Sequence, residues 1–203
     1  MSHETYLALK SASKTLRPDL EALRASGAAP RLHPNGFIQV DLSSDTRVHV
    51  WPEEALSTAD PYCPIHDHTY GFRSLVDKGS VRNIDLEAIA HEAGEYRLWE
   101  IKQWAAERRT PTPRFVDDKR YALRPLSDKR HAAGMLYEMQ PFVFHYSDAE
   151  PGTVTIIKIL PSEPGRAARI AAHLGVEPDS RFERDVSPER QAELWDLIFR
   201  TIP

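Results

Sequence analysis

The hydrophobic positions follow three patterns along the chain. Residues 2–26 carry leucines at helical spacing among Ala, Lys, Glu and Arg, and Arg17-Pro18 interrupts this run, so we expect two short amphipathic helices. From residue 37 onward, short β-like runs alternate with turn residues. After Pro161 the pattern returns to helix. The expected strands cover residues 37–42, 46–51, 64–70, 72–84 with a break at Lys78-Gly79, 96–104, 121–126, 135–145 and 153–160.

The two ends of the chain are expected to flank a β core. Residues 165–174 are rich in Ala and Arg and are followed by Gly175, which predicts a helix with a C-terminal glycine. Ser187 and Pro188 have the order of an N-cap and a first-turn proline, and a closing helix should run to about Thr201 and pack an apolar stripe on the barrel. We therefore predict one domain, residues 1–203, with a helical extension at 1–30, an antiparallel β sandwich or barrel at 37–160 and a helical extension at 161–203.

Composition narrows the classes of partner. Twenty-six basic and thirty acidic residues give a net charge of −4, without the basic stripe that binding to a phosphate backbone requires, so no nucleic acid is expected. No apolar run approaches the roughly 20 residues that span a bilayer, and no signal pattern opens the chain. The one cysteine, Cys63, fits a reducing compartment. We expect a cytoplasmic protein with no membrane partner.

The candidate chemistry is concentrated at Ile65-His66-Asp67-His68-Thr69. Residues two apart on a strand face the same side, so His66 and His68 can present both imidazoles to one metal ion while Asp67 points away. His145 ends a late β-like run and could return alongside as a third ligand. Three imidazoles suit Fe(II), Ni, Zn, Mn or Cu, although a solvated surface turn would show the same pair of histidines.

These residues resemble the cupin superfamily. His66-x-His68, three residues, Phe72, six more residues and Gly79 follow the spacing of the first cupin motif, and Pro141 to His145 stands where the second motif supplies its last histidine. The resemblance covers roughly residues 37–160 and implies a jelly-roll-like cupin β-barrel. The absence of a glutamate ligand at Phe72 or Arg73 is similar to the three-histidine cupins of the cysteine dioxygenase type.

The chain departs from that type in one respect. The thiol dioxygenases carry a Ser-x-His-x-Tyr relay on the strand after the last metal histidine, and this chain reads Thr153-Val-Thr155-Ile-Ile157 there. The crosslinked cysteine of some members also has no counterpart. Cysteine itself is therefore a doubtful substrate, while oxygen chemistry on another compound stays open.

Further groups could surround the metal. Arg47, His49 and Trp51 share one face of an expected strand, and Arg47 or Arg73 could hold a carboxylate or phosphate, unless Arg47 faces solvent and the valines form the core. Tyr70, two residues after His68, could supply a phenol for proton transfer. Glu138 could be a ligand or base if Pro141 breaks its strand, and Cys63 could approach the metal.

We expect a metal-dependent enzyme with one divalent ion, an Fe(II) dioxygenase acting on a small anionic substrate. The alternatives are a metal-dependent lyase, dehydratase or isomerase, and a non-catalytic cupin that binds a small ligand. An exposed hairpin edge at residues 37–51 would allow a homodimer. The remaining histidines are expected to be ordinary surface residues: His3, His33, His91, His131 and His173.

Overall fold

The computed structural model describes residues 3–33, 35–54, 56, 65–101, 114–162, 165–176, 178 and 187–202. Two helices and twelve strands are formed within these residues, and none of the described helices is long and apolar enough to cross a membrane. In chain order the elements are α1 (His3–Ala25), β1 (Arg31–His33), β2 (Phe37–Asp41), β3 (Thr46–Trp51), β4 (Tyr70–Lys78), β5 (Ser80–Ala90), β6 (Tyr96–Ile101), β7 (Arg114–Phe115), β8 (Tyr121–Ala132), β9 (Leu136–Met139), β10 (Phe144–Ala149), β11 (Thr153–Ser162), β12 (Ala168–His173) and α2 (Pro188–Thr201).

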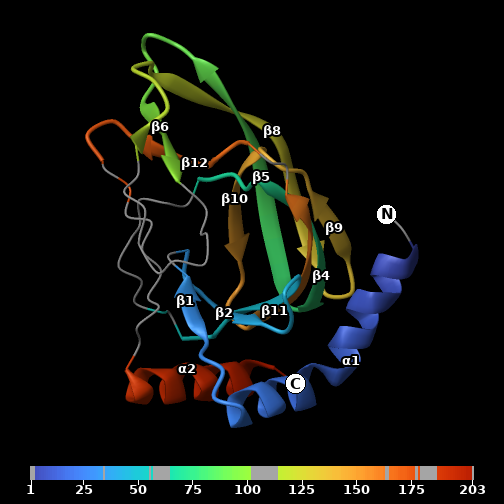
Figure 1. Ribbon diagram of the computed structural model, residues 1–203. Coiled ribbons are helices and arrows are strands. Elements are labelled where there is room, and N and C mark those ends of the chain that lie inside the picture. Colours follow the sequence, from blue (N-terminus) through green and yellow to red (C-terminus); the bar gives the residue numbers. More distant parts are fainter. Residues whose placement is uncertain are drawn as a thin grey trace.

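The strands form two antiparallel sheets (Figure 1). Sheet A has the order β1-β2-β3-β11-β4-β9, and sheet B has the order β10-β5-β8-β6-β12 with β7 paired to β6. The prediction of an antiparallel β core with helices at the ends is therefore confirmed. The two sheets agree with the sandwich alternative of that prediction, and no pairing between the described strands closes them into a barrel.

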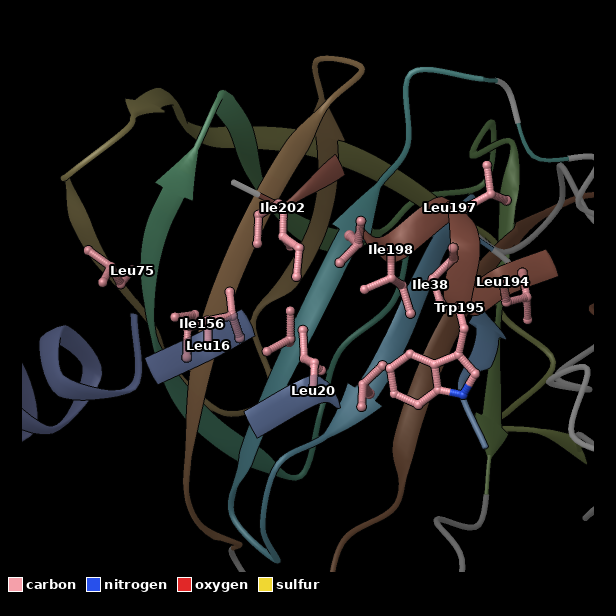
Figure 2. Packing of buried hydrophobic residues seen from close by; sticks show 14 of the residues in the cluster. Leu16, Leu20, Ile38, Leu75, Ile156, Leu194, Trp195, Leu197, Ile198 and Ile202 are labelled. Atoms are coloured by element: carbon pink, nitrogen blue, oxygen red, sulfur yellow. The ribbon is translucent and has the colours of Figure 1, made fainter. Parts of the chain in front are cut away.

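Both helices cover one face of sheet A (Figure 2). Leu16 and Leu20 of α1 and Leu194 and Ile198 of α2 are buried against the apolar face of the central strands. Full burial of such side chains contributes roughly 1.5–3 kcal/mol each. On sheet A this face carries Ile38, Val40, Val48, Val50, Leu75, Val154 and Ile156.

The other face of sheet A turns toward sheet B. Phe72, Tyr137 and Ile157 of sheet A pack in one buried cluster with Val81 of sheet B. Because neighbouring residues on a strand alternate faces, Arg47, His49 and Trp51 lie opposite to the valines of β3 that contact the helices. The interior between the sheets is thus where the candidate polar residues of β3 lie.

Two helix predictions were wrong. A single helix passes through Pro18, because Leu16 and Leu20 are both buried on sheet A and their packing offsets the lost backbone hydrogen bond. The segment predicted as a helix at 165–174 instead contains strand β12, paired with β6. The Ala-rich strand is buried on both faces, and this packing overrides the helical preference of alanine. Within the described part of residues 161–203, the predicted helical extension is therefore limited to α2.

Three strand and helix boundaries follow the sequence signals. Gly79, with φ of 75°, lies between β4 and β5, where the chain passes from sheet A to sheet B. The run at 135–145 divides at Pro141 into β9 and β10, and Phe142 there has φ of 59°. Ser187 caps α2 by accepting a hydrogen bond from the Arg190 backbone N–H at 3.3 Å.

Candidate metal centre

Residues 65–68 lie in sheet B before the chain enters sheet A at Tyr70. His66 and His145 exchange backbone hydrogen bonds of 3.2 and 3.0 Å, and His66 also forms an antiparallel bridge with Ile170 of β12. The backbone N–H of Phe142 donates to the carbonyl of His68 at 2.9 Å. In the described part of the strand predicted at 64–70, the pairing is thus limited to bridges of His66, to β10 on one side and to β12 on the other.

Asp67 fixes this segment from the face opposite to the histidines. Its fully buried carboxylate accepts hydrogen bonds from the backbone N–H of Arg169 at 2.6 Å and from Arg169 Nε at 2.7 Å. The Arg169 guanidinium also lies over the ring of Phe144, 4.6 Å from its centroid. The segment is therefore tied through its middle residue to β12, while its flanking side chains lie toward the interior.

The three histidine rings come together between the sheets. His66 Nε2 and His68 Nε2 are 3.0 Å apart, and a ring nitrogen of each of the three histidines lies within 4.8 Å of the others. His145 is buried, and its Nδ1 lies 3.0 Å from the carbonyl oxygen of Val143. Because that carbonyl can only accept, Nδ1 carries the hydrogen and Nε2 is left with a free lone pair.

The chemistry of this donor set fits a divalent metal ion. Burial lowers the pKa of His68 well below its ordinary value, with neighbouring histidines adding to the effect, and burial likewise lowers the pKa of His145. Neutral imidazoles are the form that binds a metal. With metal–nitrogen distances of about 2.1 Å, two ligands of one ion lie at most about 4.2 Å apart, so the His66–His68 pair fits as it stands, whereas the full set, which spans up to 4.8 Å, would have to contract by about half an ångström on binding. His66, His68 and His145 could therefore hold a single ion.

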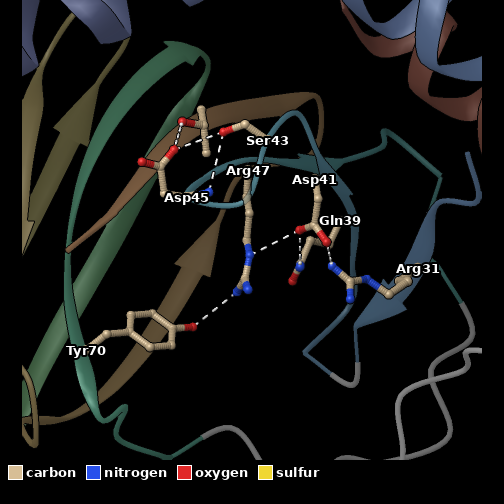
Figure 3. A network of polar contacts seen from close by, with 8 residues as sticks. Arg31, Gln39, Asp41, Ser43, Asp45, Arg47 and Tyr70 are labelled. Atoms are coloured by element: carbon tan, nitrogen blue, oxygen red, sulfur yellow. Dashed lines mark hydrogen bonds and ion pairs between the residues drawn. The ribbon is translucent and has the colours of Figure 1, made fainter. Parts of the chain in front are cut away.

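Tyr70 and Arg47 lie beside this cluster. The Tyr70 ring stacks on His68 with centroids 4.9 Å apart and an interplanar angle of 2°. Arg47 donates to the Tyr70 hydroxyl at 3.2 Å, and its Nε lies 3.1 Å from Asp41 (Figure 3). Arg31 pairs with the same carboxylate, so two guanidinium groups share one negative charge.

His49 faces the same interior from β3. Its ring stacks on Phe37 with centroids 4.3 Å apart, and its Nε2 is buried without a hydrogen-bond partner among the described residues. Burial, with Arg47 and Arg31 nearby, lowers the pKa of His49 to about 3. His49 is therefore a neutral imidazole at physiological pH.

One of the histidines that we expected at the surface, His33, instead borders the site. His33 lies on β1, stacks on Phe37 with centroids 4.1 Å apart, and has its ring 6.3 Å from that of His66. Burial lowers its pKa well below the ordinary value. The available signal was weak, because β1 is only three residues long and is followed by the turn-forming sequence Pro34-Asn35-Gly36. His33 borders the site rather than the open surface.

Two candidates are not brought to the histidines. Arg73 forms an ion pair of 2.8 Å with Glu138 across β4 and β9 and also donates to Thr5 of α1 at 2.8 Å. This pair lies on the face of sheet A that turns toward α1, so neither Arg73 nor Glu138 joins the three rings. Cys63 falls outside the described residues.

Comparisons with known proteins add little to this geometry. No family model matches the sequence, and no curated protein does. Among solved structures, hydroquinone 1,2-dioxygenase from Sphingomonas sp. TTNP3 is 8% identical, with a TM-score of 0.33 over 62% of this chain and 66% of that one. Escherichia coli YcfD, described as a ribosomal oxygenase, is 13% identical, with a TM-score of 0.32 over 92% of this chain and 44% of that one. The chain thus spans less than two thirds of either protein, and TM-scores this low leave fold and activity to be argued from its own residues.

Proposed function

We propose that the protein is a metal-dependent enzyme that holds one Fe(II) ion on His66, His68 and His145 and oxidises a small anionic substrate with molecular oxygen. The observation that carries this proposal is the convergence of three histidine ring nitrogens within 4.8 Å between the sheets. When bound, the ion would supply open coordination positions and redox chemistry. Ni, Zn, Mn and Cu suit the same ligands, so the metal has to be identified by elemental analysis.

Arg47 would bind the acid group of the substrate. Arg31, Arg47 and Asp41 together carry one excess positive charge, and Gln39 also donates to Asp41 at 3.1 Å. The Asp41 carboxylate thus accepts from Arg31 and Gln39 as well as from Arg47. The N–H groups of Arg47 that do not contact Asp41 or Tyr70 can therefore donate to an anion. A planar guanidinium binds a carboxylate through two parallel hydrogen bonds.

Tyr70 would hold or deliver a proton. Arg47 donates to its hydroxyl oxygen, which leaves the phenolic hydrogen available to a substrate atom near His68. We expect Tyr70→Phe to lower kcat more than it raises KM, since the ring can still stack on His68. His49, which stays neutral, would act as a hydrogen-bond partner rather than as a cation.

The test is oxygen consumption by protein loaded with Fe(II) under anaerobic conditions and then mixed with air-saturated buffer and a panel of thiols and small carboxylic acids. Oxygen uptake that requires both metal and one substrate, and that is lost in His145→Gln, would support the proposal. Metal-dependent turnover without oxygen uptake would indicate a lyase, dehydratase or isomerase instead. Metal binding without turnover of any compound would indicate a ligand-binding protein.

A further inference from the structure

Asp85 lies next to the metal centre on sheet B. It is the direct cross-strand partner of His145 in the pairing of β5 with β10, and of Ser127 in the pairing of β5 with β8. Directly opposed residues of antiparallel strands share a face, with Cβ atoms about 5 Å apart. The carboxyl group of Asp85 therefore lies on the same interior face as the His145 ring.

One oxygen of this carboxylate is buried without a partner. Ser127 Oγ donates to Asp85 Oδ2 at 2.6 Å, whereas Oδ1 is buried and has no hydrogen-bond partner among the described residues. Leaving a carboxylate oxygen buried and unpaired is unfavourable, so such an atom is a candidate acceptor for a water molecule or for a donor group of a ligand. The negative charge of Asp85 also reaches the centre, since it raises the pKa of His145 against the larger lowering by burial.

The local backbone is irregular at the same point. Asp85 pairs with Ser127, but Leu86 pairs with Pro125, so Leu126 is an extra residue in β8. Leu126 is 58% exposed, and the bulge therefore contributes little to packing. Bulges next to binding sites commonly re-aim a neighbouring side chain. Here the bulge lies beside the one residue of β5 that faces His145.

We propose that Asp85 is a substrate-specificity residue that accepts a hydrogen bond from a donor group on the substrate, either a hydroxyl or an ammonium. This inference rests on the proposed function, because it places the substrate at the three histidines. Arg47 on sheet A contacts Tyr70, which stacks on His68, and Asp85 on sheet B is paired with His145, so opposite charges lie near two of the three ligands. The substrate class is a small carboxylic acid that carries a second, hydrogen-bond-donating group.

The experiment compares three acids that share a three-carbon skeleton: propionate, 3-hydroxypropionate and 3-aminopropionate. Their affinities are measured by calorimetry on the Zn(II)-loaded full-length protein, so that no turnover is needed. The variants are Asp85→Ala, which removes both acceptor oxygens, and Asp85→Asn, which removes the charge but keeps one acceptor. Asp128→Asn is the matched control, because Asp128 lies on the neighbouring strand in an exposed pair with Arg82.

We expect the wild type and Asp128→Asn to bind one donor-bearing acid at least tenfold more tightly than propionate, and Asp85→Ala to lose this preference. A preference for the ammonium compound that Asp85→Asn abolishes identifies a cationic donor. A preference for the hydroxyl compound that Asp85→Asn keeps identifies an alcohol. Should Asp85→Ala not fold, the ratio of affinities in Asp85→Asn decides the ammonium case, and Asp85→Ser replaces Asp85→Ala in the hydroxyl case.

Equal or undetectable binding of all three acids by the wild type, or a preference that survives in Asp85→Ala, would overturn the assignment of Asp85. Failure of the proposed function has a different signature. Zinc content measured on the same samples shows whether the three histidines hold a metal. Selective binding without oxygen uptake by the Fe(II) form would reject the oxidation but retain the role of Asp85.

Discussion

Asp67→Asn tests whether the buried pair with Arg169 positions the two neighbouring histidines. The substitution keeps the size of the side chain and one acceptor oxygen, but replaces the other oxygen with an NH2 group. In the wild type the two oxygens accept from the Arg169 backbone N–H and from its guanidinium. In the variant, an amide NH2 must face one of these donors.

The expected cost follows from the unmet donor. A buried donor without an acceptor costs about 1–3 kcal/mol, and the side chain of Arg169 is 24% exposed, so water can reach part of its charge. Burial raises the pKa of Asp67 more than Arg169 lowers it, which means that the ion pair does not fully offset the desolvation of the carboxylate. We therefore expect a loss of about 1–3 kcal/mol from unmet hydrogen bonds rather than from lost Coulomb attraction, and metal binding weakened by roughly 10- to 100-fold.

The assay is urea unfolding of the metal-free protein, paired with metal titration against a competing chelator. The control is Asp128→Asn, which removes the same charge from a pair with Arg82 whose side chains are 43% and 49% exposed. Exposed pairs of this kind contribute about 0–1 kcal/mol, so the control should unfold almost like the wild type. Equal losses in the two variants, or unchanged metal affinity in Asp67→Asn, would refute the reasoning.

Three further predictions follow from single features. His145→Gln should weaken metal binding by on the order of 100-fold or more, measured by chelator competition, because it removes one of three ligands. Gly79→Ala should destabilise the protein by about 2 kcal/mol or more in urea unfolding, since φ is 75° and a Cβ would lie 2.9 Å from the Cα of Thr153. Between pH 6.5 and 5 the unfolded chain protonates His49 and the folded protein does not, so this residue alone should lower the free energy of unfolding by about 2 kcal/mol as the pH falls. In urea unfolding, the free energy of unfolding of His49→Gln should therefore depend less steeply on pH than that of the wild type. An equally steep dependence would contradict the low pKa of His49.

Turn and capping residues in the sequence correctly predicted where some elements begin or end. Gly79 marked the turn between β4 and β5, and Ser187 with Pro188 marked the start of α2. The strand β12 was missed because its composition favours a helix, and only its pairing with β6 and its burial on both faces determine its conformation. Such long-range packing cannot be read from a single segment.

Sequence spacing likewise predicted only the part of the candidate centre that lies within one segment. The spacing of His66 and His68 placed both rings on one side of an extended chain, and the structure brings them to His145. The spacing gives no sign of Asp85 or His33, because their positions depend on which strands lie side by side. Arg73 looked equivalent to Arg47 in sequence, yet alternation along β4 turns it toward α1.

The bridges on both sides of His66 have a consequence for the order of events during folding. His66 and His68 are close in sequence, whereas His145 lies far along the chain and joins them where β10 bridges residue 66. An incompletely folded chain therefore offers a metal ion only two adjacent imidazoles, which bind more weakly than three. A metal bound at the finished centre would act as a crosslink between distant parts of the chain, and its binding free energy would stabilise the fully assembled protein more than partly folded forms. Tight metal binding is therefore expected only once the three histidines are in place.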